Sequence, residues 1–362
     1  MFFHRLTSAW ALGLTLLGPG AAPPVLAPRP PGSTAIDQQR LTTPPGAAAS
    51  DGAPTPKQRT IALGLFADDV STSYVPQLRE IAALGATHVS LIVPLYQTDN
   101  RSADLTLHTR WSPTLELVAD TIRAARREHL EVTLSPLVRL LHPTTGQRAA
   151  PLAPADRDAW FKNYGELLGD LAAVAAQTGA TRFRVANQLS SLDDDLPRWR
   201  PLLERLRAVF GGKLIASASA DHYRDTKLFD LVDEEDVVAT FSLRASAAAA
   251  ATDAALDAAW ARWKTQLLGW HAGHTRPLTL TIRYRSRAGS TSAPADDSPG
   301  GPVDLDEQRR AFAAFRRAWA GESHLDGVTV ETWSAPGGAT STGTTPRGKP
   351  AEQEIKKLLE TL

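Results

Sequence analysis

The chain has 362 residues, and its 39 lysines and arginines balance its 39 aspartates and glutamates, so the formal net charge is zero. It holds no cysteine, which excludes disulfides, thiolate nucleophiles, iron–sulfur clusters and cysteine-bound zinc. Because no basic run is present, nucleic acid and anionic membranes are not expected partners, and a neutral ligand such as carbohydrate fits better.

The N-terminal part of the chain has the composition of a leader followed by a tether. Residues 1–27 place the apolar stretch Leu6–Leu17 before a Gly/Ala/Pro region, the layout of a secretory signal with a cleavage site near Ala22 or Ala27. Residues 28–58 are rich in Pro, Ala, Gly, Ser and Thr, which predicts a flexible linker. The apolar stretch is shorter than the about 20 residues of a membrane span. We therefore expect export to the periplasm or the exterior, with an uncleaved N-terminal anchor as the alternative.

From residue 59 to 362, short apolar runs alternate with amphipathic stretches. Several of these runs are continuously apolar, as in strands that are buried on both faces. Eight such strands alternating with helices predict a single (β/α)₈ TIM barrel, and the alternative is an open doubly wound sheet. The expected strands are Ile61–Phe66, His88–Val93, Val132–Leu137, Arg182–Ala186, Leu214–Ala218, Val237–Phe241, Leu278–Tyr284 and Val328–Trp333.

The stretches between these strands carry signals of helix starts and buried faces. Ser73 and Ser112 stand where a helix cap is expected, and either Asp304 or Asp306 can cap the last long helix before the eighth strand. Apolar residues from Trp160 to Leu171 recur at helical spacing, which predicts one buried helix face.

Four stretches at the expected strand ends, taken in their order and spacing, resemble glycoside hydrolase family 113, a group of retaining β-mannanase-type barrels. The resemblance runs from about Ile61 to Lys357, and it implies a barrel that acts on or binds an oligo- or polysaccharide. The stretches are Val89–Gln97, Phe183–Ser191, Leu280–Ser286 and Gly327–Ala351.

The resemblance places the family's two catalytic glutamates at positions that hold no carboxylate. The acid/base position, which follows Asn187, holds Gln188, and the nucleophile position holds Thr281. Retaining hydrolysis needs one carboxyl group as proton donor and a second, about 5–5.5 Å away, as nucleophile. A glutamine amide has no proton to give at a useful pKa, and a threonine hydroxyl without a base is a poor nucleophile. We therefore expect a glycosidase-like protein that has lost catalysis and that binds a saccharide or acts as a scaffold in an envelope or polysaccharide process.

Polar and aromatic side chains at the expected strand ends can contact a sugar. Five of them can hold hydroxyl groups or stack on a pyranose ring, with core or rim packing as the alternative for each. These five are Tyr96, Gln97, Asn187, Tyr284 and Trp333. The amide of Gln188 can hydrogen-bond a glycosidic oxygen, and Arg283 can grip a carboxylate or phosphate unless it pairs with a nearby aspartate. The expected ligand-binding residues are Tyr96, Gln97, Asn187, Tyr284, Trp333, Gln188 and Arg283.

Acidic residues elsewhere keep an active β-glycoside hydrolase, retaining or inverting, as the second hypothesis. An inverting enzyme tolerates about 6.5–9.5 Å between its two acids, so relocated carboxylates are conceivable, although solvated loops explain them more simply. The candidates are Asp68, Asp69, Asp193, Asp194, Asp195, Asp221 and Glu331. His271 and His274 have a spacing that can present two metal ligands, but no third ligand is nearby in the sequence, so we expect neither a metal nor another cofactor.

Overall fold

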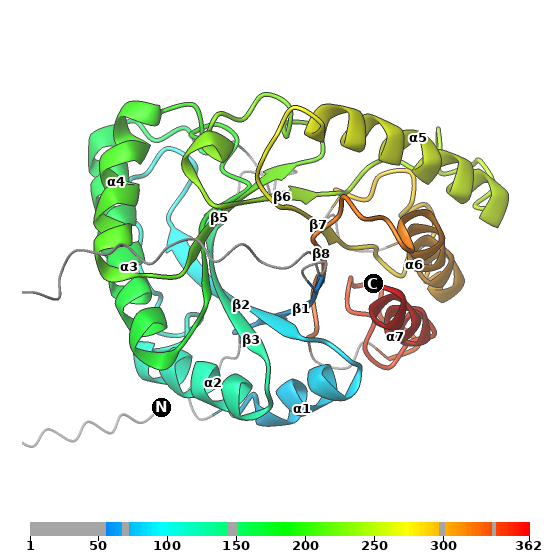
Figure 1. The fold of residues 1–362 in the computed structure, drawn as a ribbon, viewed down its shortest axis with the longest axis horizontal. Coiled ribbons are helices and arrows are strands. Elements are labelled where there is room, and N and C mark those ends of the chain that lie inside the picture. The colour runs from blue at the N-terminus through cyan, green and yellow to red at the C-terminus, as the bar shows by residue number, and fades with distance from the viewer. Residues whose placement is uncertain (1–55, 67–71, 143–150, 297–300, 335–337) are drawn as a thin grey trace, which may run out of the picture. The chain divides into compact units, whose positions relative to one another are not determined.

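The computed structural model describes residues 56–66, 72–142, 151–296, 301–334 and 338–362. Eight parallel strands form a closed barrel in chain order, and the last strand pairs with the first. This confirms the predicted (β/α)₈ barrel and excludes the open sheet (Figure 1). The predicted signal, most of the predicted linker, and Asp68 and Asp69 lie outside the described residues.

All eight expected strands are present, with different ends. Side chains alternate between the lumen of the barrel and the surrounding helices, because successive residues of a strand point to opposite faces. The strands are β1 (Gln58–Gly64), β2 (His88–Gln97), β3 (Glu131–Leu140), β4 (Arg182–Asn187), β5 (Lys213–Ser219), β6 (Glu234–Val238), β7 (Leu278–Ile282) and β8 (Gly327–Val330).

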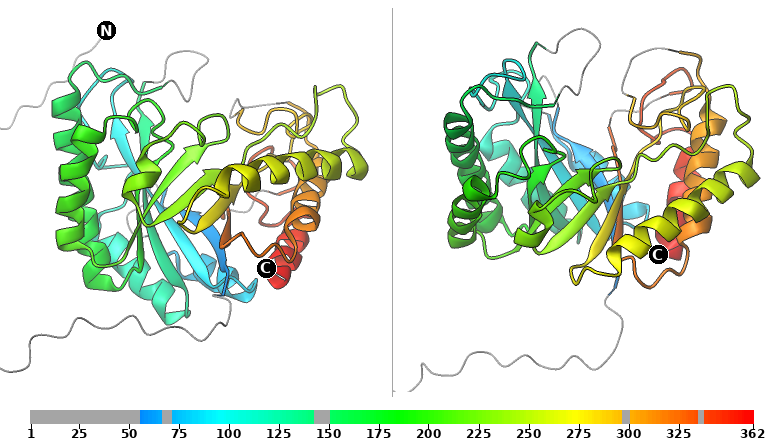
Figure 2. Two further views of the ribbon diagram at one scale, coloured as in Figure 1. Left: turned by 45° about the horizontal axis from the view of Figure 1, so that its top comes forward. Right: turned by 90° about the horizontal axis from the view of Figure 1, so that it is seen from above.

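Helices lie along the outside of the strands and cover the barrel wall (Figure 2). The core between wall and helices contains Trp160, Trp199, Trp260 and Trp319, all fully buried. Within the described chain, the connection from β5 to β6 carries only a short 3₁₀ helix. The helices are α1 (Val75–Ala83), α2 (Leu115–Arg127), α3 (Arg157–Thr178), α4 (Leu196–Val209), η1 (Leu228–Leu231), α5 (Asp253–His271), α6 (Leu305–Trp319) and α7 (Ala351–Thr361).

Two of the predicted helix caps are wrong by one or two residues. Helix α1 has Tyr74 at its N-cap rather than Ser73. Helix α2 is capped by Thr114, whose side chain accepts a hydrogen bond from the backbone of the first turn. Ser112 instead donates its hydroxyl to the carbonyl of Pro94, at 2.7 Å, and so ties the turn before α2 to β2. Of the two candidates for α6, Asp304 is the cap.

Strand β6 begins and ends earlier than predicted. The prediction missed its start because the first three residues of the strand are acidic. The expected strand was Val237–Phe241, and the observed strand spans Glu234–Val238. Asp236 pairs with an arginine across the lumen, and Glu234 pairs with Arg182 at 3.1 Å. Partnered carboxylates can be buried where isolated ones cannot, and this partnership is invisible in a hydropathy pattern.

His88, at the start of β2, makes the stability of the barrel depend on pH. Burial, with the nearby charges of Arg182 and Arg59, lowers the pKa of the imidazole to about 4. The unfolded chain binds the proton near pH 6.5 and the folded chain only near pH 4, so stability is complete above pH 6.5 and falls as the pH drops towards 4. The loss expected from this group is up to about 3 kcal/mol, from 1.36 kcal/mol per pKa unit.

Urea unfolding at pH 7, 5.5 and 4 measures this loss in the wild type and in His88→Gln. We expect the variant to lose less stability than the wild type over this interval, because glutamine does not titrate. Equal losses in the two proteins would show that another group carries the acid sensitivity.

Candidate functional site

A buried ion pair in the lumen joins β4 to β6, the two neighbours of β5, and organises the side chains around it. Arg184 of β4 contacts Asp236 of β6 at 2.5 Å, and the side chains are 7% and 0% exposed. Thr279 and Thr281 of β7 both donate their hydroxyls to Asp236, at 3.0 Å and 2.9 Å respectively. Asp236 therefore accepts hydrogen bonds from one cation and two alcohols, which offset the cost of burying its charge.

Sequence reasoning missed this ion pair. Arg184 and Asp236 are read as members of two separate strands, and nothing in the chain shows that these strands flank β5, so that the two side chains meet in the lumen. The available signal was the spacing of the charged residues. Arg182 and Arg184 lie two apart and so share one face of β4, and Glu234 and Asp236, their partners, share one face of β6 in the same way.

Above the ion pair, near the carboxyl ends of the strands, lies a cavity of only about 20 Å³. Its lining includes Ser135, Asn187, Thr281 and Glu331, contributed by or next to four different strands. A volume of roughly 10–15 Å³ is needed for one water molecule, so this cavity has space for a water but not for a pyranose ring. Within the described structure, a sugar would lie above the cavity and not in it.

The two positions at which the family resemblance places catalytic carboxylates have different surroundings. Thr281 is 5% exposed and directs its hydroxyl to Asp236. Gln188 follows β4 on a backbone with φ of 55°, a left-handed conformation that side chains other than glycine rarely adopt. Its backbone N–H donates to the carbonyl of Ser217 at 3.0 Å, while its amide makes no hydrogen bond to any described residue.

Arg283 forms an ion pair with Glu331 across β7 and β8. The guanidinium nitrogen lies 3.6 Å from the carboxylate, and the side chains are 17% and 14% exposed. The sequence offered an aspartate as the alternative partner of Arg283, and the structure supplies a glutamate. Among the residues that line the small cavity, Glu331 is the carboxylate, so the cavity's acid is neutralised by its neighbour.

Asn187 is a predicted ligand-binding residue that the structure places at the small cavity. Its side chain lines the cavity, accepts a hydrogen bond from Ser217 at 3.2 Å and donates weakly to Ser135 at 3.5 Å. Tyr96 lies at the rim, where its ring packs against those of His108 and Trp111 at 5.5 Å and 5.7 Å between centroids.

Gln97 does not reach the cavity, which corrects its predicted role as a ligand contact. The residue is fully buried, and its carbonyl oxygen accepts the indole N–H of Trp160, on α3, at 2.9 Å. Its amide donates to the backbone carbonyls of Asp99 and Ser102 at 2.6 Å and 2.8 Å. All of its hydrogen-bonding groups therefore hold the turn after β2 against α3.

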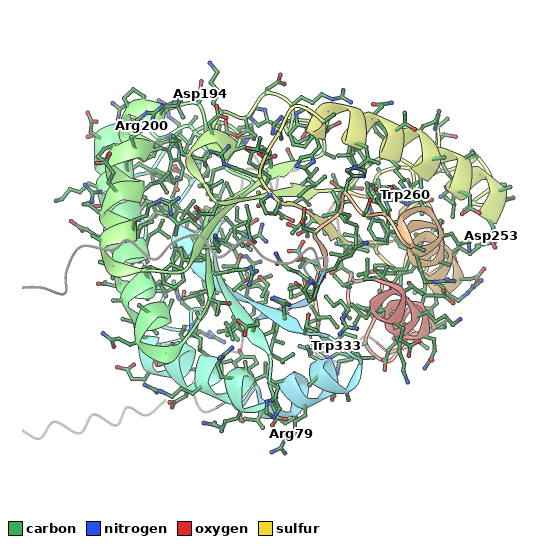
Figure 3. All side chains as sticks on the ribbon, in the orientation of Figure 1. Arg79, Asp194, Arg200, Asp253, Trp260 and Trp333 are labelled. Atoms are coloured by element: carbon green, nitrogen blue, oxygen red, sulfur yellow. The ribbon has the colours of Figure 1, made fainter. Side chains whose placement is uncertain are left out.

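Tyr284 and Trp333 are also core residues, because their side chains pack against the surrounding helices. Tyr284 is fully buried against Phe312 of α6, with ring centroids 5.1 Å apart, and burial raises the pKa of its phenol. Trp333 donates its indole N–H to Glu80 of α1 at 3.0 Å, and Figure 3 shows it on the side of the barrel that α1 covers. Neither ring is available to stack on a sugar.

Three of the acids proposed as relocated catalysts have other partners, and a fourth is exposed to solvent. Asp193 contacts His222 at 3.0 Å, and Asp195 contacts Arg198 and Arg157 at 2.7 Å and 3.2 Å. Asp221 accepts the hydroxyl of Ser219 at 2.5 Å. Asp194 is exposed on the periphery of the barrel (Figure 3).

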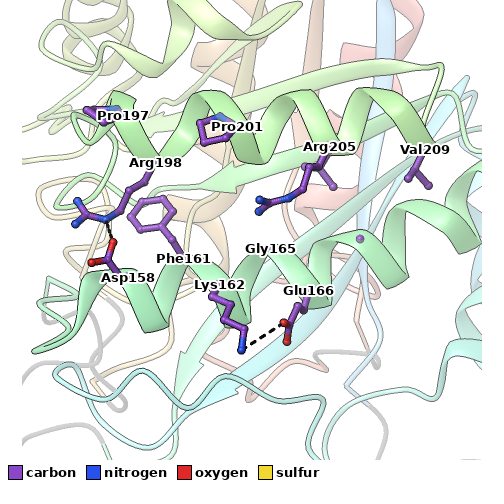
Figure 4. Close-up of a pocket in the computed structure, with 12 residues that line it drawn as sticks. Asp158, Phe161, Lys162, Gly165, Glu166, Pro197, Arg198, Pro201, Arg205 and Val209 are labelled. Carbon is purple, nitrogen blue, oxygen red and sulfur yellow. Dashed lines mark hydrogen bonds and ion pairs between the residues drawn. The ribbon is translucent and has the colours of Figure 1, made fainter.

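A larger cavity, about 530 Å³, lies away from the strand ends, between α3 and α4 on the outer wall (Figure 4). Its apolar lining includes Phe161, Gly165 and Pro201. The ion pair Asp158–Arg198 spans it at 2.8 Å, and the charges of Lys162 and Glu166 lie 3.9 Å apart on α3. Nothing in this groove contacts the lumen, so it is not the family's catalytic centre.

The histidines considered as metal ligands have ordinary partners. His271 contacts the carbonyl of Arg276 at 2.9 Å, and His274 contacts Glu235 at 2.9 Å. Over the ranges that the structure describes, no three His, Cys, Asp or Glu side chains form a group that could hold a metal ion. None of the helices in those ranges is long and apolar enough to cross a membrane.

Comparison with known proteins agrees with this architecture. A family model described as Glycoside Hydrolase Family 113 matches residues 63–345. The GH113 β-mannanase of Alicyclobacillus acidocaldarius, solved in complex with ManMIm, is 20% identical with a TM-score of 0.74, over 84% of this chain and 98% of that one. A second GH113 β-1,4-mannanase is 17% identical with a TM-score of 0.73, over 85% and 100% of the two chains.

More distant barrels share the fold. The β-glucuronidase of Faecalibacterium prausnitzii is 10% identical with a TM-score of 0.58, over 84% of this chain and 49% of its own. Among curated proteins, no sequence matches this chain. Likeness to structures at such identities shows the fold alone, whereas the family model spans most of the barrel. The chain belongs to glycoside hydrolase family 113.

Proposed function

We propose that this family 113 barrel does not carry out retaining hydrolysis and instead binds a saccharide at the rim of the barrel, as part of an envelope or polysaccharide process. The observation that carries the proposal is the state of Thr281. Its hydroxyl, at the nucleophile position of the family resemblance, is donated to a carboxylate that already pairs with Arg184.

The neighbouring Asp236 does not turn Thr281 into an effective nucleophile. A general base must take a proton in the transition state, and an oxygen of this carboxylate is already occupied by Arg184 at 2.5 Å. Asp236 also accepts the hydroxyl of Thr279, so its oxygens are engaged before any substrate arrives. The threonine is thus held as a structural donor.

The proton donor is missing as well. The amide of Gln188 can hydrogen-bond a glycosidic oxygen but cannot protonate it, and general acid catalysis alone contributes typically ~10²–10⁴-fold. Glu331, the carboxylate of the cavity lining, is held by Arg283 at 3.6 Å. A cation at this place raises the free energy of a positively charged oxocarbenium-like transition state.

The second candidate is an active hydrolase with relocated acids, and Glu331 is the observation that favours it. Glu331 lines the cavity, and Asp68 and Asp69 follow the strand β1 in the sequence, outside the described residues. A pair formed by Glu331 and one of these aspartates would restore hydrolysis.

An assay of the full chain on 4-nitrophenyl β-mannoside, β-glucoside and β-glucuronide separates the two candidates. We expect no nitrophenol release above that of buffer, from the wild type or from Gln188→Ala and Thr281→Ala. The GH113 β-mannanase of Alicyclobacillus acidocaldarius serves as the active comparison. Turnover that survives both alanine variants but disappears in Glu331→Gln would refute the proposal in favour of relocated acids.

A further inference from the structure

Aromatic rings and one cation gather at the rim of the barrel beside β1, β2 and β3. Tyr96 belongs to β2, Arg139 to β3, and Phe66 follows β1, while His108 and Trp111 lie between β2 and α2. We call these five residues the rim platform. The ring of Trp111 stacks on that of His108, with centroids 4.2 Å apart and planes 15° from parallel. Tyr96 contacts both rings from the side.

The aromatic part of the rim platform is rigidly built, with Tyr96 buried beneath it and Trp111 open to solvent. Trp111 is 37% exposed, among the few large apolar side chains exposed in the described structure. Backbone N–H groups of Arg110 and Trp111 donate to Nδ1 of His108, at 3.1 Å and 3.3 Å. Ser112 ties the same turn to β2 through the carbonyl of Pro94. An exposed indole that is already held in place loses little conformational entropy when a ligand covers it.

Arg139 supplies a cation whose hydrogen-bond donors are not used by the described residues. Its guanidinium carbon lies 5.4 Å from the ring centroid of Phe66 and 6.0 Å from that of Tyr96, within the range of a cation–π contact. The side chain is exposed, and no carboxylate in the described ranges pairs with it. By contrast, Arg157, at the start of α3, pairs with Asp195.

We infer that the rim platform binds an acidic saccharide, with Trp111 stacked on a pyranose ring and Arg139 paired with a hexuronate carboxylate. The inference rests on the proposed saccharide-binding function and specifies its ligand class. Aromatic faces bind the apolar side of a sugar ring, and a planar guanidinium matches a carboxylate bidentately. The steps from Trp111 to Tyr96 and from Tyr96 to Arg139, 5.7 Å and 6.0 Å, let one ligand span both.

The charge around the rim platform favours an acidic ligand over a neutral one. Glu331, the carboxylate of the cavity lining, is paired with Arg283, which offsets its negative charge. Among the residues that the structure describes, Arg139 has no carboxylate partner, and its guanidinium lies over the rings of Phe66 and Tyr96. The net charge of the whole chain is zero, which pointed to a neutral ligand, but a net charge does not show how charges are distributed around the rim platform.

Calorimetric titration of the full chain with matched hexasaccharides tests the inference. The first pair is β-1,4-mannohexaose and its mannuronate counterpart, and the second is β-1,4-glucohexaose and its glucuronate counterpart. Each pair differs at C6 alone. We expect at least one uronate to bind roughly tenfold or more tightly than its neutral partner, because a hydrogen bond to a charged group typically contributes that much. The difference is expected to shrink as salt is added.

Variants assign the two contacts separately. Arg139→Leu is expected to abolish the preference for the uronate, and Trp111→Ala to weaken binding roughly tenfold, whereas Trp111→Phe retains most of it. Arg127→Leu removes the same charge from the end of α2 that precedes β3, at the opposite end of the barrel, and is expected to change nothing. Thermal unfolding of each variant confirms that it is folded.

Three results would overturn the inference. They are equal affinity for both members of each pair, a uronate preference that persists in Arg139→Leu, and absence of binding by all four ligands to the folded wild type. A preference that is lost in Arg139→Leu but unaffected by Trp111→Ala would overturn the stacking contact. The proposed loss of hydrolysis stands or falls separately, on the aryl glycoside assay.

Discussion

Replacing Asp236 by alanine is expected to lower the free energy of unfolding by about 3–5 kcal/mol, the cost of breaking a buried ion pair by removing one partner. Arg184 would keep its charge while 6% exposed, with no carboxylate to compensate it. Thr281 would lose the acceptor of its hydroxyl, and Thr279 would keep only the carbonyl of Glu235, at 3.3 Å. The change reaches the centre of the lumen, where the structure has space for little more than one water molecule.

Urea unfolding at pH 7 measures this cost, and two other variants define it. Asp257→Ala breaks a pair of similar geometry, 2.7 Å from Arg317, whose side chains are 41% and 35% exposed. We expect it to cost less than about 1 kcal/mol, as surface pairs do. The double variant Arg184→Met, Asp236→Leu is expected to recover much of the loss, because apolar residues need no partner. A cost below 1 kcal/mol for Asp236→Ala would show that water compensates the arginine.

Replacing Trp160 by alanine is expected to cost about 3–5 kcal/mol, the range for truncating a large aromatic side chain in a core. The ring is fully buried on α3, stacked against Tyr164 at 4.7 Å and edge-on to Phe161 at 5.1 Å. Its indole N–H is also the donor that satisfies Gln97. The loss therefore combines an unfilled volume with an unsatisfied buried amide.

Trp160→Phe separates these two contributions. It keeps an aromatic ring against Tyr164 but leaves the carbonyl oxygen of Gln97 without its donor, and an unsatisfied buried group costs about 1–3 kcal/mol. Trp263→Ala, which removes a partly exposed tryptophan of α5, is the control and is expected to cost less than Trp160→Ala. A neutral Trp160→Phe would mean that Gln97 finds another donor, and its role in holding the turn after β2 would then be smaller than the contacts indicate.

The barrel was predictable because strands buried on both faces leave continuous apolar runs, such as the one in β2. Strand β6 shows the limit of that signal. Its acidic start has the composition of a loop. Arginines of β4, more than one element away in the chain, pair with Glu234 and Asp236 and so allow these acids to be buried in a strand. Pairing across the lumen is a tertiary fact that a hydropathy pattern does not contain.

The candidate site was predictable by position along each strand but not by face. Gln97 follows Leu91, Val93 and Leu95 at intervals of two, and all four are buried on the outer face of β2. Tyr284 continues the outer series of Leu280 and Ile282 in the same way, as alternation along a strand requires.

The same alternation describes the residues on the inner face. Thr279 and Thr281 reach Asp236, and Arg283 continues the series to Glu331. Counting residues in steps of two along each strand would have placed Gln97 and Tyr284 on the outer face, and so excluded them as ligand contacts. It would not have helped with Trp333, which lies an odd number of residues after the outward-facing Val330 and yet contacts Glu80 of α1.

Intact-mass spectrometry after incubation with activated 2-deoxy-2-fluoro-β-glycosides measures covalent glycosyl-enzyme formation directly. The fluorine slows breakdown of the intermediate, so any carboxylate that attacks the sugar is left labelled. Since the lumen offers an alcohol bound to Asp236 where an attacking anion would stand, we predict an unchanged mass for this chain, beside complete labelling of an active family 113 β-mannanase. A stoichiometric mass increase that maps to Glu331, Asp68 or Asp69 would contradict the loss of retaining chemistry.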